Sequence, residues 1–215
     1  MKKKETILAI GAHNDDPIFG AGGTLAKYAE EGKTIKTVIF SFGELSHPYL
    51  KPEVIIEQRV KEAIKADKII GGKGVAYFGV KEGKFRQEIK QKNVEKRLLD
   101  IIKKEKPTKI FTHGANDAHP DHVAVYNLIN DLVKKKKITC DVYTYDVWEL
   151  VRFRKRIVPH LVVDITKTFP TKIKAIKAHK SQQITILNLL WTVYLKALIN
   201  GWNNNCKYAE VFDKI

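Results

Sequence analysis

The sequence predicts an α/β protein with a Rossmann-like, doubly wound, mostly parallel sheet, helices on both faces and a C-terminal helical extension. Short apolar segments alternate with amphipathic ones from residue 6 to residue 165, which is the βαβ pattern. Hydrophobic residues make up 44% of the 215 residues, enough for a sizeable core. The chain shows no internal repeat and no linker rich in Pro, Gly or Ser, so residues 1–215 are expected to form a single domain.

Strands and helices are expected where apolar residues recur with the spacing of a strand or a helix, between glycines, prolines and polar turns. The predicted strands are Thr6–Ile10, Ile35–Phe42, Val75–Phe78, Lys109–Thr112, Asp141–Val147 and Leu161–Ile165. The predicted helices are Ala21–Glu31, Glu53–Ile70, Val94–Lys104, His122–Lys134, Thr168–His179 and Gln182–Gly201. Gly32 and Gly71 follow the first two helices, as C-terminal glycines do, and the third helix stops before Pro107. The segments Gly43–Pro52 and Gly79–Gln91 are predicted loops.

The last predicted helix is apolar on two faces. Its stripes are Ile184, Leu187, Trp191, Leu195 and Leu198, and Ile186, Leu190, Val193 and Ala197. Its charge-free run from Ser181 to Leu195 is 15 residues, shorter than the ~20 that a bilayer span needs. This pattern indicates a helix buried in the core or at a homo-oligomer interface, with a peripheral membrane contact as the alternative.

The chain is strongly basic, with 39 Lys and Arg against 24 Asp and Glu and a net charge of +15. Such an excess raises nucleic acid, anionic membranes and acidic substrates as partners. The lysines are spread along the chain without a nucleic-acid-binding motif, so no nucleic acid is expected as a partner and a solvated surface is favoured. The two cysteines, Cys140 and Cys206, form no CxxC pair, which fits a reducing, cytoplasmic location.

The most informative segment is Gly11-Ala12-His13-Asn14-Asp15-Asp16, at the end of the first predicted strand. Carboxyl ends of strands are where ligands bind in open parallel sheets. Two adjacent carboxylates beside an imidazole would be stabilised by a divalent cation. The competing explanation is a capped helix start, with Asp16 as N-cap and Pro17 at the first helical position. A phosphate loop at Gly20–Gly23 is disfavoured because the GxGxxG pattern is missing.

A second cluster, His119-Pro120-Asp121-His122, follows the fourth predicted strand. In the doubly wound order 3-2-1-4-5, strands 1 and 4 are neighbours. His13, Asp16 and one histidine of the second cluster would then complete a three-ligand zinc site with one open position. Asp15 would be placed to take a proton from metal-bound water, and the remaining histidine would face the reacting carbonyl.

These two clusters resemble those of the LmbE-like (PIG-L-type) de-N-acetylase family, whose motifs are usually AHPDDE and HPDH. Three further segments resemble the family's R-x-x-E, A-x-x-S-Q and A-E-x-F patterns: Arg59-Val60-Lys61-Glu62, Ala178-His179-Lys180-Ser181-Gln182 and Tyr208-Ala209-Glu210-Val211-Phe212. The resemblance therefore extends over nearly the whole chain. Asn14 stands where the family has proline, and Pro17 where it has glutamate.

The resemblance implies a role for each matching residue. His13, Asp16 and His122 would bind one Zn²⁺ per chain, and Asp15 would be the general base. His119 would stabilise the oxyanion and protonate the amine leaving group. Asp121 would orient His119, and Arg59 would contact the substrate.

The implied function is a zinc-dependent hydrolase that removes the acetyl group from an N-acetylated amino sugar or glycoconjugate. The resemblance also implies a homo-oligomer. Two alternatives remain at this point: another mononuclear metal hydrolase, acting on an amide or phosphoester, and a basic nucleic-acid-binding protein.

Overall fold

The computed structural model describes residues 5–47, 49–148 and 159–215 of the chain. The strands are β1 (Thr6–Gly11), β2 (Thr34–Ile39), β3 (Val75–Tyr77), β4 (Lys109–His113), β5 (Asp141–Tyr145), β6 (His160–Asp164) and β7 (Ala209–Lys214). The helices are α1 (Asp16–Glu30), α2 (Pro52–Ile69), α3 (Phe85–Gln91), α4 (Val94–Glu105), α5 (Pro120–Lys134), α6 (Phe169–Ile176) and α7 (Gln183–Trp202). A short 3₁₀ turn, η1 (Lys180–Gln182), precedes α7.

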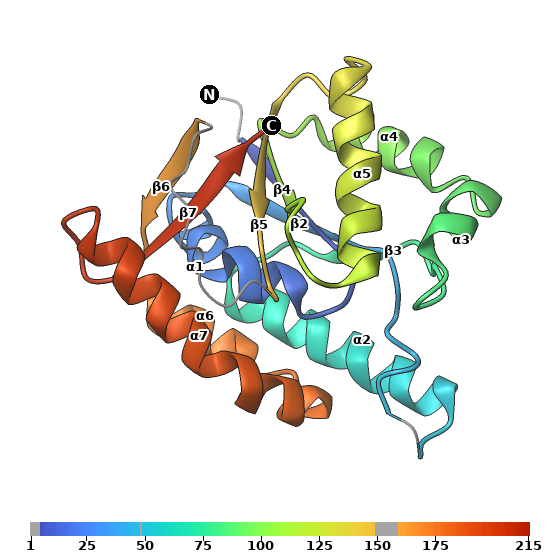
Figure 1. The fold of residues 1–215 in the computed structure, drawn as a ribbon, viewed down its shortest axis with the longest axis horizontal. Helices are drawn as coiled ribbons and strands as arrows, with labels where there is room; N and C mark the ends of the chain where they lie inside the picture. The colour runs from blue at the N-terminus through green and yellow to red at the C-terminus, as the bar shows by residue number, and fades with distance from the viewer. Residues whose placement is uncertain (1–4, 48, 149–158) are drawn as a thin grey trace.

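The strands form one sheet in the order β3-β2-β1-β4-β5-β7-β6 (Figure 1). Strands β1 to β5 pair in parallel, and β7 runs antiparallel between β5 and β6. The predicted order 3-2-1-4-5 is confirmed, and with it the adjacency of β1 and β4. The carboxyl ends of these two strands therefore lie side by side at one edge of the sheet.

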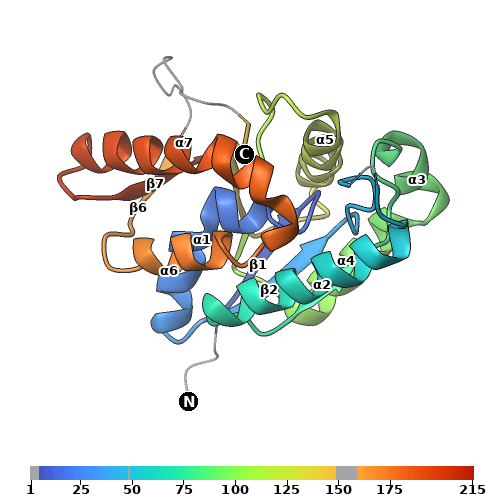
Figure 2. The same ribbon diagram turned by 90° about the horizontal axis from the view of Figure 1, so that it is seen from below.

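Helices cover both faces of the sheet (Figure 2). Alternate residues of β1 point to opposite faces: Ile7 and Ala9 pack with α1, α6 and α7, whereas Leu8 and Ile10 pack with α3, α4 and α5. This alternation is the period-2 geometry of a strand, and it divides the core into two layers. The predicted doubly wound α/β class is confirmed.

Several predicted boundaries were wrong. The helix α1 begins at Asp16, not at Ala21, and α3 lies within the predicted loop Gly79–Gln91. No strand was predicted after the last helix, but Ala209–Lys214 forms β7. The β7 segment is buried in part on both faces, so it lacks the polar–apolar alternation that identifies a strand in sequence.

The glycines of α1 permit close packing of the helix. A Cβ at Gly20 would lie 2.1 Å from the Tyr145 ring, and one at Gly23 would lie 2.7 Å from Ile165. These glycines therefore have a packing role in the structure, and their segment is helical. This agrees with the sequence argument against a phosphate loop.

A buried ion pair fastens β7 to α6, and its carboxylate also bonds α1. The Lys172 Nζ atom lies 2.6 Å from Glu210 Oε1, and both side chains are buried. The same carboxylate accepts hydrogen bonds from the backbone N–H groups of Gly23 (3.1 Å) and Thr24 (2.7 Å). Thr168 Oγ1 donates to the Gly23 carbonyl at 2.8 Å. Glu210 thus connects β7, α6 and α1 through one charged group.

Replacing Glu210 with alanine is expected to lower the free energy of unfolding by about 3–5 kcal/mol, because Lys172 would be left as an uncompensated buried charge. Urea denaturation followed by circular dichroism measures the change. The control is Glu57→Ala, which removes an exposed ion pair with Lys61 and is expected to leave the stability nearly unchanged. Equal stabilities of the Glu210→Ala and Glu57→Ala proteins would contradict the role given to Glu210.

Candidate metal centre and active-site cavity

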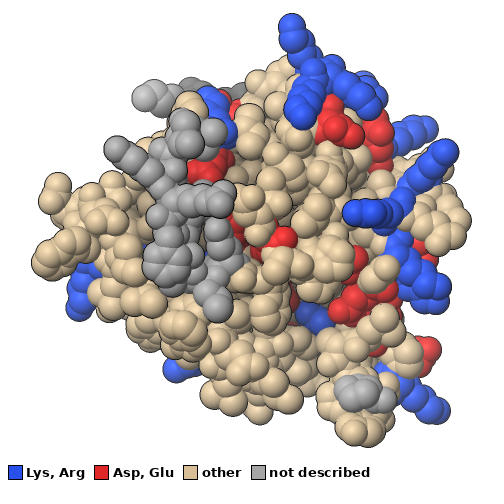
Figure 3. Space-filling view, in the orientation of Figure 1, with Lys and Arg blue, Asp and Glu red and all other residues tan. Residues whose placement is uncertain are grey.

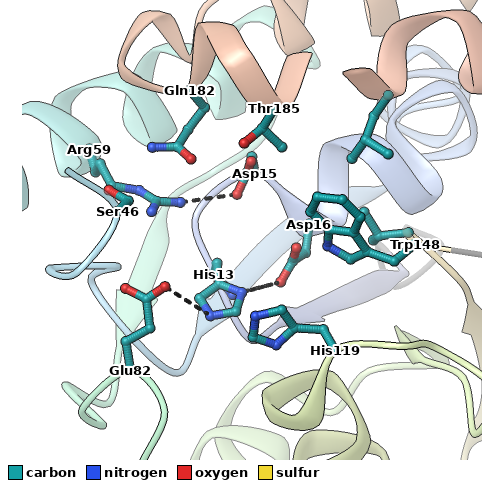
Figure 4. A pocket seen from close by; sticks show the side chains of 12 residues that line it. His13, Asp15, Asp16, Ser46, Arg59, Glu82, His119, Trp148, Gln182 and Thr185 are labelled. Carbon is teal, nitrogen blue, oxygen red and sulfur yellow. Dashed lines mark hydrogen bonds and ion pairs between the residues drawn. The ribbon is translucent and has the colours of Figure 1, made fainter. Parts of the chain in front are cut away.

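The two sequence clusters meet at the carboxyl edge of the sheet. His13 follows β1, Asp16 begins α1, and His119 and His122 lie at the start of α5 just beyond β4. His13, Asp16 and His119 line a cavity of about 210 Å³ (Figure 4), and His122 is fully buried beside His13 and Asp16. The lining residues of the cavity are His13, Asp15, Asp16, Ser46, Arg59, Glu82, His119, Val147, Trp148, Gln182, Thr185 and Leu189.

The side chains of His13, Asp16 and His122 form a triangle of residues, in which each oxygen of Asp16 faces one of the two histidines. His13 Nδ1 lies 3.3 Å from His122 Nε2 and 3.4 Å from Asp16 Oδ2, and His122 Nε2 lies 3.3 Å from Asp16 Oδ1. Ligands of a tetrahedral zinc ion with bonds of about 2.0–2.1 Å are about 3.3 Å apart. Two imidazole nitrogens and one carboxylate oxygen are also a donor set that suits zinc. The residues present therefore fit this metal.

Each histidine of this triangle has a carboxylate at its other ring nitrogen. His122 Nδ1 lies 2.9 Å from Asp117 Oδ1, and His13 Nε2 lies 3.4 Å from Asp121 Oδ2. Carboxylates in this position fix the ring orientation and increase the basicity of a metal-binding histidine. Asp117 is itself held by the backbone N–H of Val147, at 2.8 Å.

Sequence reasoning missed Asp117, although it lies only two residues before His119. Asp121 was weighed as the residue that orients His119, but its carboxylate instead accepts from the Gly83 N–H at 2.9 Å and faces His13. That expectation was wrong for the side chain; only the backbone N–H of Asp121 contacts His119.

The carboxylates around the triangle favour positive charge at this place. Burial alone would lower the pKa of His13, but hydrogen bonds to Asp121 and Asp16 outweigh it and raise this pKa to about 10. Burial also opposes a charge on His122, yet Asp16 and Asp117 raise its pKa to about 9. A divalent cation would supply the same positive charge in place of the two imidazole protons.

His113 also lies in this cluster, at the end of β4. Its Nε2 atom accepts the Ala12 N–H at 3.0 Å and is 3.1 Å from Asp16 Oδ2. Burial and the neighbouring charge of His122 lower its pKa to about 4, so the ring is neutral. Because the Nε2 lone pair accepts the Ala12 N–H, this nitrogen is not free to bind a metal ion.

Other combinations of these groups are also close enough to share an ion. Potential ligand atoms lie within 4.8 Å of one another in two overlapping sets: His13, His119 and His122, and Asp16, His113 and His122. The set of His13, Asp16 and His122 is favoured because their facing atoms are separated by distances that suit a tetrahedral zinc ion. In the other two sets, His113 Nε2 accepts the Ala12 N–H and His119 Nδ1 accepts the Asp121 N–H.

Asp15 and Arg59 form a buried pair on the other side of the cavity. Arg59 Nη2 donates to Asp15 Oδ1 at 3.1 Å, and Nη1 donates to the Gly43 carbonyl at 3.3 Å. Gly43 has φ +74°, and a Cβ there would lie 2.2 Å from Arg59 Nη1, so the close approach of the guanidinium requires glycine. Arg59 was predicted to contact the substrate; it lines the cavity and also holds Asp15.

His119 is the N-cap of α5. Its Nδ1 atom accepts the Asp121 N–H at 3.2 Å, so in a neutral ring the proton is on Nε2. Burial lowers the pKa of His119, and the charges of His13 and His122 lower it further. The cavity is therefore lined by a hydrogen-bond donor at His119.

Asn14, which departs from the family pattern, bonds to the loop after β2 and to the end of β3. Its Nδ2 donates to the Phe42 carbonyl at 2.7 Å, and its Oδ1 accepts from the Tyr77 hydroxyl at 2.6 Å. Pro17, the other departure, lies in the first turn of α1, where proline is favoured. Asn14 therefore anchors the backbone of the first cluster to β2 and β3, and neither departure removes a polar group from the triangle.

The fold and this site define a class: an α/β protein with a candidate mononuclear metal centre at the crevice of a Rossmann-like sheet. The chain belongs to the PIG-L family, described as GlcNAc-PI de-N-acetylase, whose sequence profile matches residues 8–133. It is therefore an enzyme of a deacetylase family, and the resemblance found in the sequence is confirmed.

Individual relatives agree with this assignment. The chain is 24% identical over 223 residues to a diacetylchitobiose deacetylase of Thermococcus kodakarensis, covering 95% of this chain and 80% of that one. The solved N,N'-diacetylchitobiose deacetylase of Pyrococcus horikoshii has a TM-score of 0.81 at 22% identity, covering 100% of this chain and 85% of that one. GalB, the 4-carboxy-2-hydroxymuconate hydratase of Pseudomonas putida KT2440, has a TM-score of 0.80 at 22% identity, covering 98% of this chain and 96% of that one. The fold alone is thus compatible with two chemistries.

Proposed function

We propose that this protein is a zinc-dependent hydrolase that removes the acetyl group from an N-acetylated amino sugar, with one zinc ion per chain held by His13, Asp16 and His122. The observation that carries the proposal is that His13 and Asp16 line one cavity with the buried Asp15–Arg59 pair, and that His122 Nε2 lies 3.3 Å from His13 Nδ1 and from Asp16 Oδ1. Membership of a deacetylase family supports the reaction type.

Asp15 acts as the general base. A zinc ion in this site would polarise the acetyl carbonyl and lower the pKa of the attacking water. Arg59 fixes the Asp15 carboxylate through Oδ1, so that the carboxylate takes the proton of that water in a defined orientation. In this role Asp15 itself is not a ligand.

His119 acts on the other side of the scissile bond. Its Nε2–H donates to the oxygen of the acetyl carbonyl as negative charge develops there. The neutral ring has no second proton to give, so the departing nitrogen receives the proton that Asp15 has taken from the water. The Asp121 N–H at Nδ1 holds the ring in the tautomer that this donation requires.

The remaining cavity wall suits an amino sugar. Polar groups that could bond sugar hydroxyls come from Ser46, Glu82, Gln182 and Thr185, and an apolar wall comes from Val147, Trp148 and Leu189. A few placed polar groups on an apolar wall are typical of small-molecule sites. The relative from Thermococcus kodakarensis is a diacetylchitobiose deacetylase, which favours a GlcNAc-type substrate.

We also propose that residues 1–215 act as one domain, because the cavity is built from residues between His13 and Leu189. A cytoplasmic location is proposed on the two cysteines, both of which are free thiols.

The direct test is an acetate-release screen of the zinc-loaded protein. The substrates are GlcNAc, diacetylchitobiose, GlcNAc-inositol and GlcNAc-malate, with 4-carboxy-2-hydroxymuconate as the hydratase substrate. Release of acetate and free amine in equal amounts, with one zinc per chain by elemental analysis, is expected. Hydration of the muconate with no acetate release from any sugar would overturn the proposal, and two metals per chain would overturn the mononuclear site.

A further inference from the structure

One face of α7 is apolar and exposed along the whole helix. The exposed residues recur at spacings of three and four and form what we name the α7 stripe: Ile184, Leu187, Trp191, Tyr194, Leu198 and Trp202. Ile184 is 78% exposed, Leu187 76% and Trp202 86%. The opposite face, with Leu189, Val193 and Ala197, packs into the core. Only one of the two predicted apolar faces is therefore buried within the described chain.

The sequence that includes α7 and the segments on either side of it is basic and contains no acidic residue. Residues 165–209 include no Asp or Glu, but seven lysines. Five of these lysines are exposed, and we name them the lysine rim: Lys180 and Lys207 lie just before and just after α7, and Lys167, Lys174 and Lys177 lie on or next to α6. Figure 3 shows the surface over α7, at the lower left, as largely tan, with blue atoms along its lower edge. Exposed Trp and Leu beside lysines are typical of a helix that lies on a membrane surface.

The helix is fixed to the domain at both ends. Before it, Ser181 bonds the Glu62 carboxylate through its N–H (2.9 Å) and its hydroxyl (2.6 Å). After it, β7 is inserted in the sheet. The segment Lys180–Trp202 is long and apolar enough to cross a membrane, with a mean hydropathy of 1.3, but its anchored ends and core-facing side favour a helix that lies in the membrane plane.

The charge of the lysine rim favours a lipid surface over a second copy of the chain as the partner of the α7 stripe. In a two-fold dimer built on the α7 stripe, the lysine rim of one protomer would face the same lysines of its partner. An anionic bilayer would instead attract these lysines while the stripe enters the headgroup region.

We propose that the α7 stripe and the lysine rim form a docking surface for an anionic lipid bilayer. Thr185 and Leu189, on the same helix, line the active-site cavity, so docking brings the cavity close to the bilayer surface. The docking surface does not depend on the deacetylase function, since none of its residues lines the cavity.

Vesicle co-sedimentation of the zinc-loaded, full-length protein tests the proposal. Vesicles of phosphatidylcholine alone are compared with vesicles that contain one quarter phosphatidylglycerol, at low and high salt. The expected result is binding to the anionic vesicles, weakened by salt, with a blue shift of tryptophan fluorescence. Leu187→Glu is expected to lower the partition coefficient about tenfold or more, and Lys180→Gln and Lys207→Gln about fivefold each.

The matched control for the lysine variants is Lys104→Gln, which removes the same single charge from α4, away from the stripe. This control is expected to bind vesicles nearly like the parent, and circular dichroism and acetate release check that the α7 variants stay folded. Three results would overturn the proposal: no binding to anionic vesicles, equal losses in the control and the α7 variants, or a dimer by light scattering that Leu187→Glu dissociates.

Discussion

The Asp15→Asn protein is expected to bind zinc like the parent and to lose about 10²–10⁴-fold in kcat, the usual contribution of a general base. The reason is that an asparagine side chain at this position retains a hydrogen-bond acceptor for Arg59 but has no basic oxygen to take the proton of water. The measurements are steady-state acetate release and elemental analysis of the same preparation.

The comparison protein is Asp100→Asn, which makes the same change at an exposed position of α4 and is expected to leave kcat unchanged. A near-parental kcat of the Asp15→Asn protein at full zinc occupancy would assign the base to another group. Loss of zinc from that protein would instead show that Asp15 supports the metal.

The largest effect on metal content is expected for His122→Ala, which removes one of the three proposed ligands. This protein should retain almost no zinc after dialysis. Asp117→Asn is expected to give a graded effect, a loss of about 10–100-fold in zinc affinity, because His122 would keep its position but lose the carboxylate at Nδ1. Competition with a chromophoric chelator measures both affinities.

His160→Ala, on β6 and exposed, is the control for removal of an imidazole. It is expected to bind zinc with parental affinity. Full zinc content in His122→Ala would show that another of the overlapping ligand sets holds the metal.

The parallel strands and their order could be predicted from the sequence, because apolar runs and the residues that end them identify each strand locally. The apolar runs of β1 and β4 end at Gly11 and His113, and parallel βαβ topology then makes these strands neighbours. That argument predicted the meeting of His13 with a histidine of the second cluster without knowledge of any contact, and the choice of His122 came from the family resemblance. The roles of His13, Asp15, Asp16, His119, His122 and Arg59 remain predictions, which the experiments above address.

The parts that could not be predicted depend on contacts between distant segments. Asp117 and Glu82 lie in loops whose composition is ordinary, and only the folded loops bring them to His122 and His13. The pairing of Arg59 with Asp15 joins residues that are 44 positions apart. Strand β7 was missed because it contains Glu210. A charged residue in a short segment normally indicates an exposed segment, but the Glu210 side chain is buried and paired with Lys172.

The position of β7 has a consequence for synthesis of the chain on the ribosome. Strand β6 pairs with β7, and β7 also borders β5, so β6 has no neighbour among the described strands until β7 has been made. Lys172 likewise meets its carboxylate only then. Strands β1 to β5 can pair earlier in synthesis, but that side of the sheet closes only after β7 has left the ribosome. A nascent chain stalled before Ala209 would expose the edge of β5 and recruit holding chaperones.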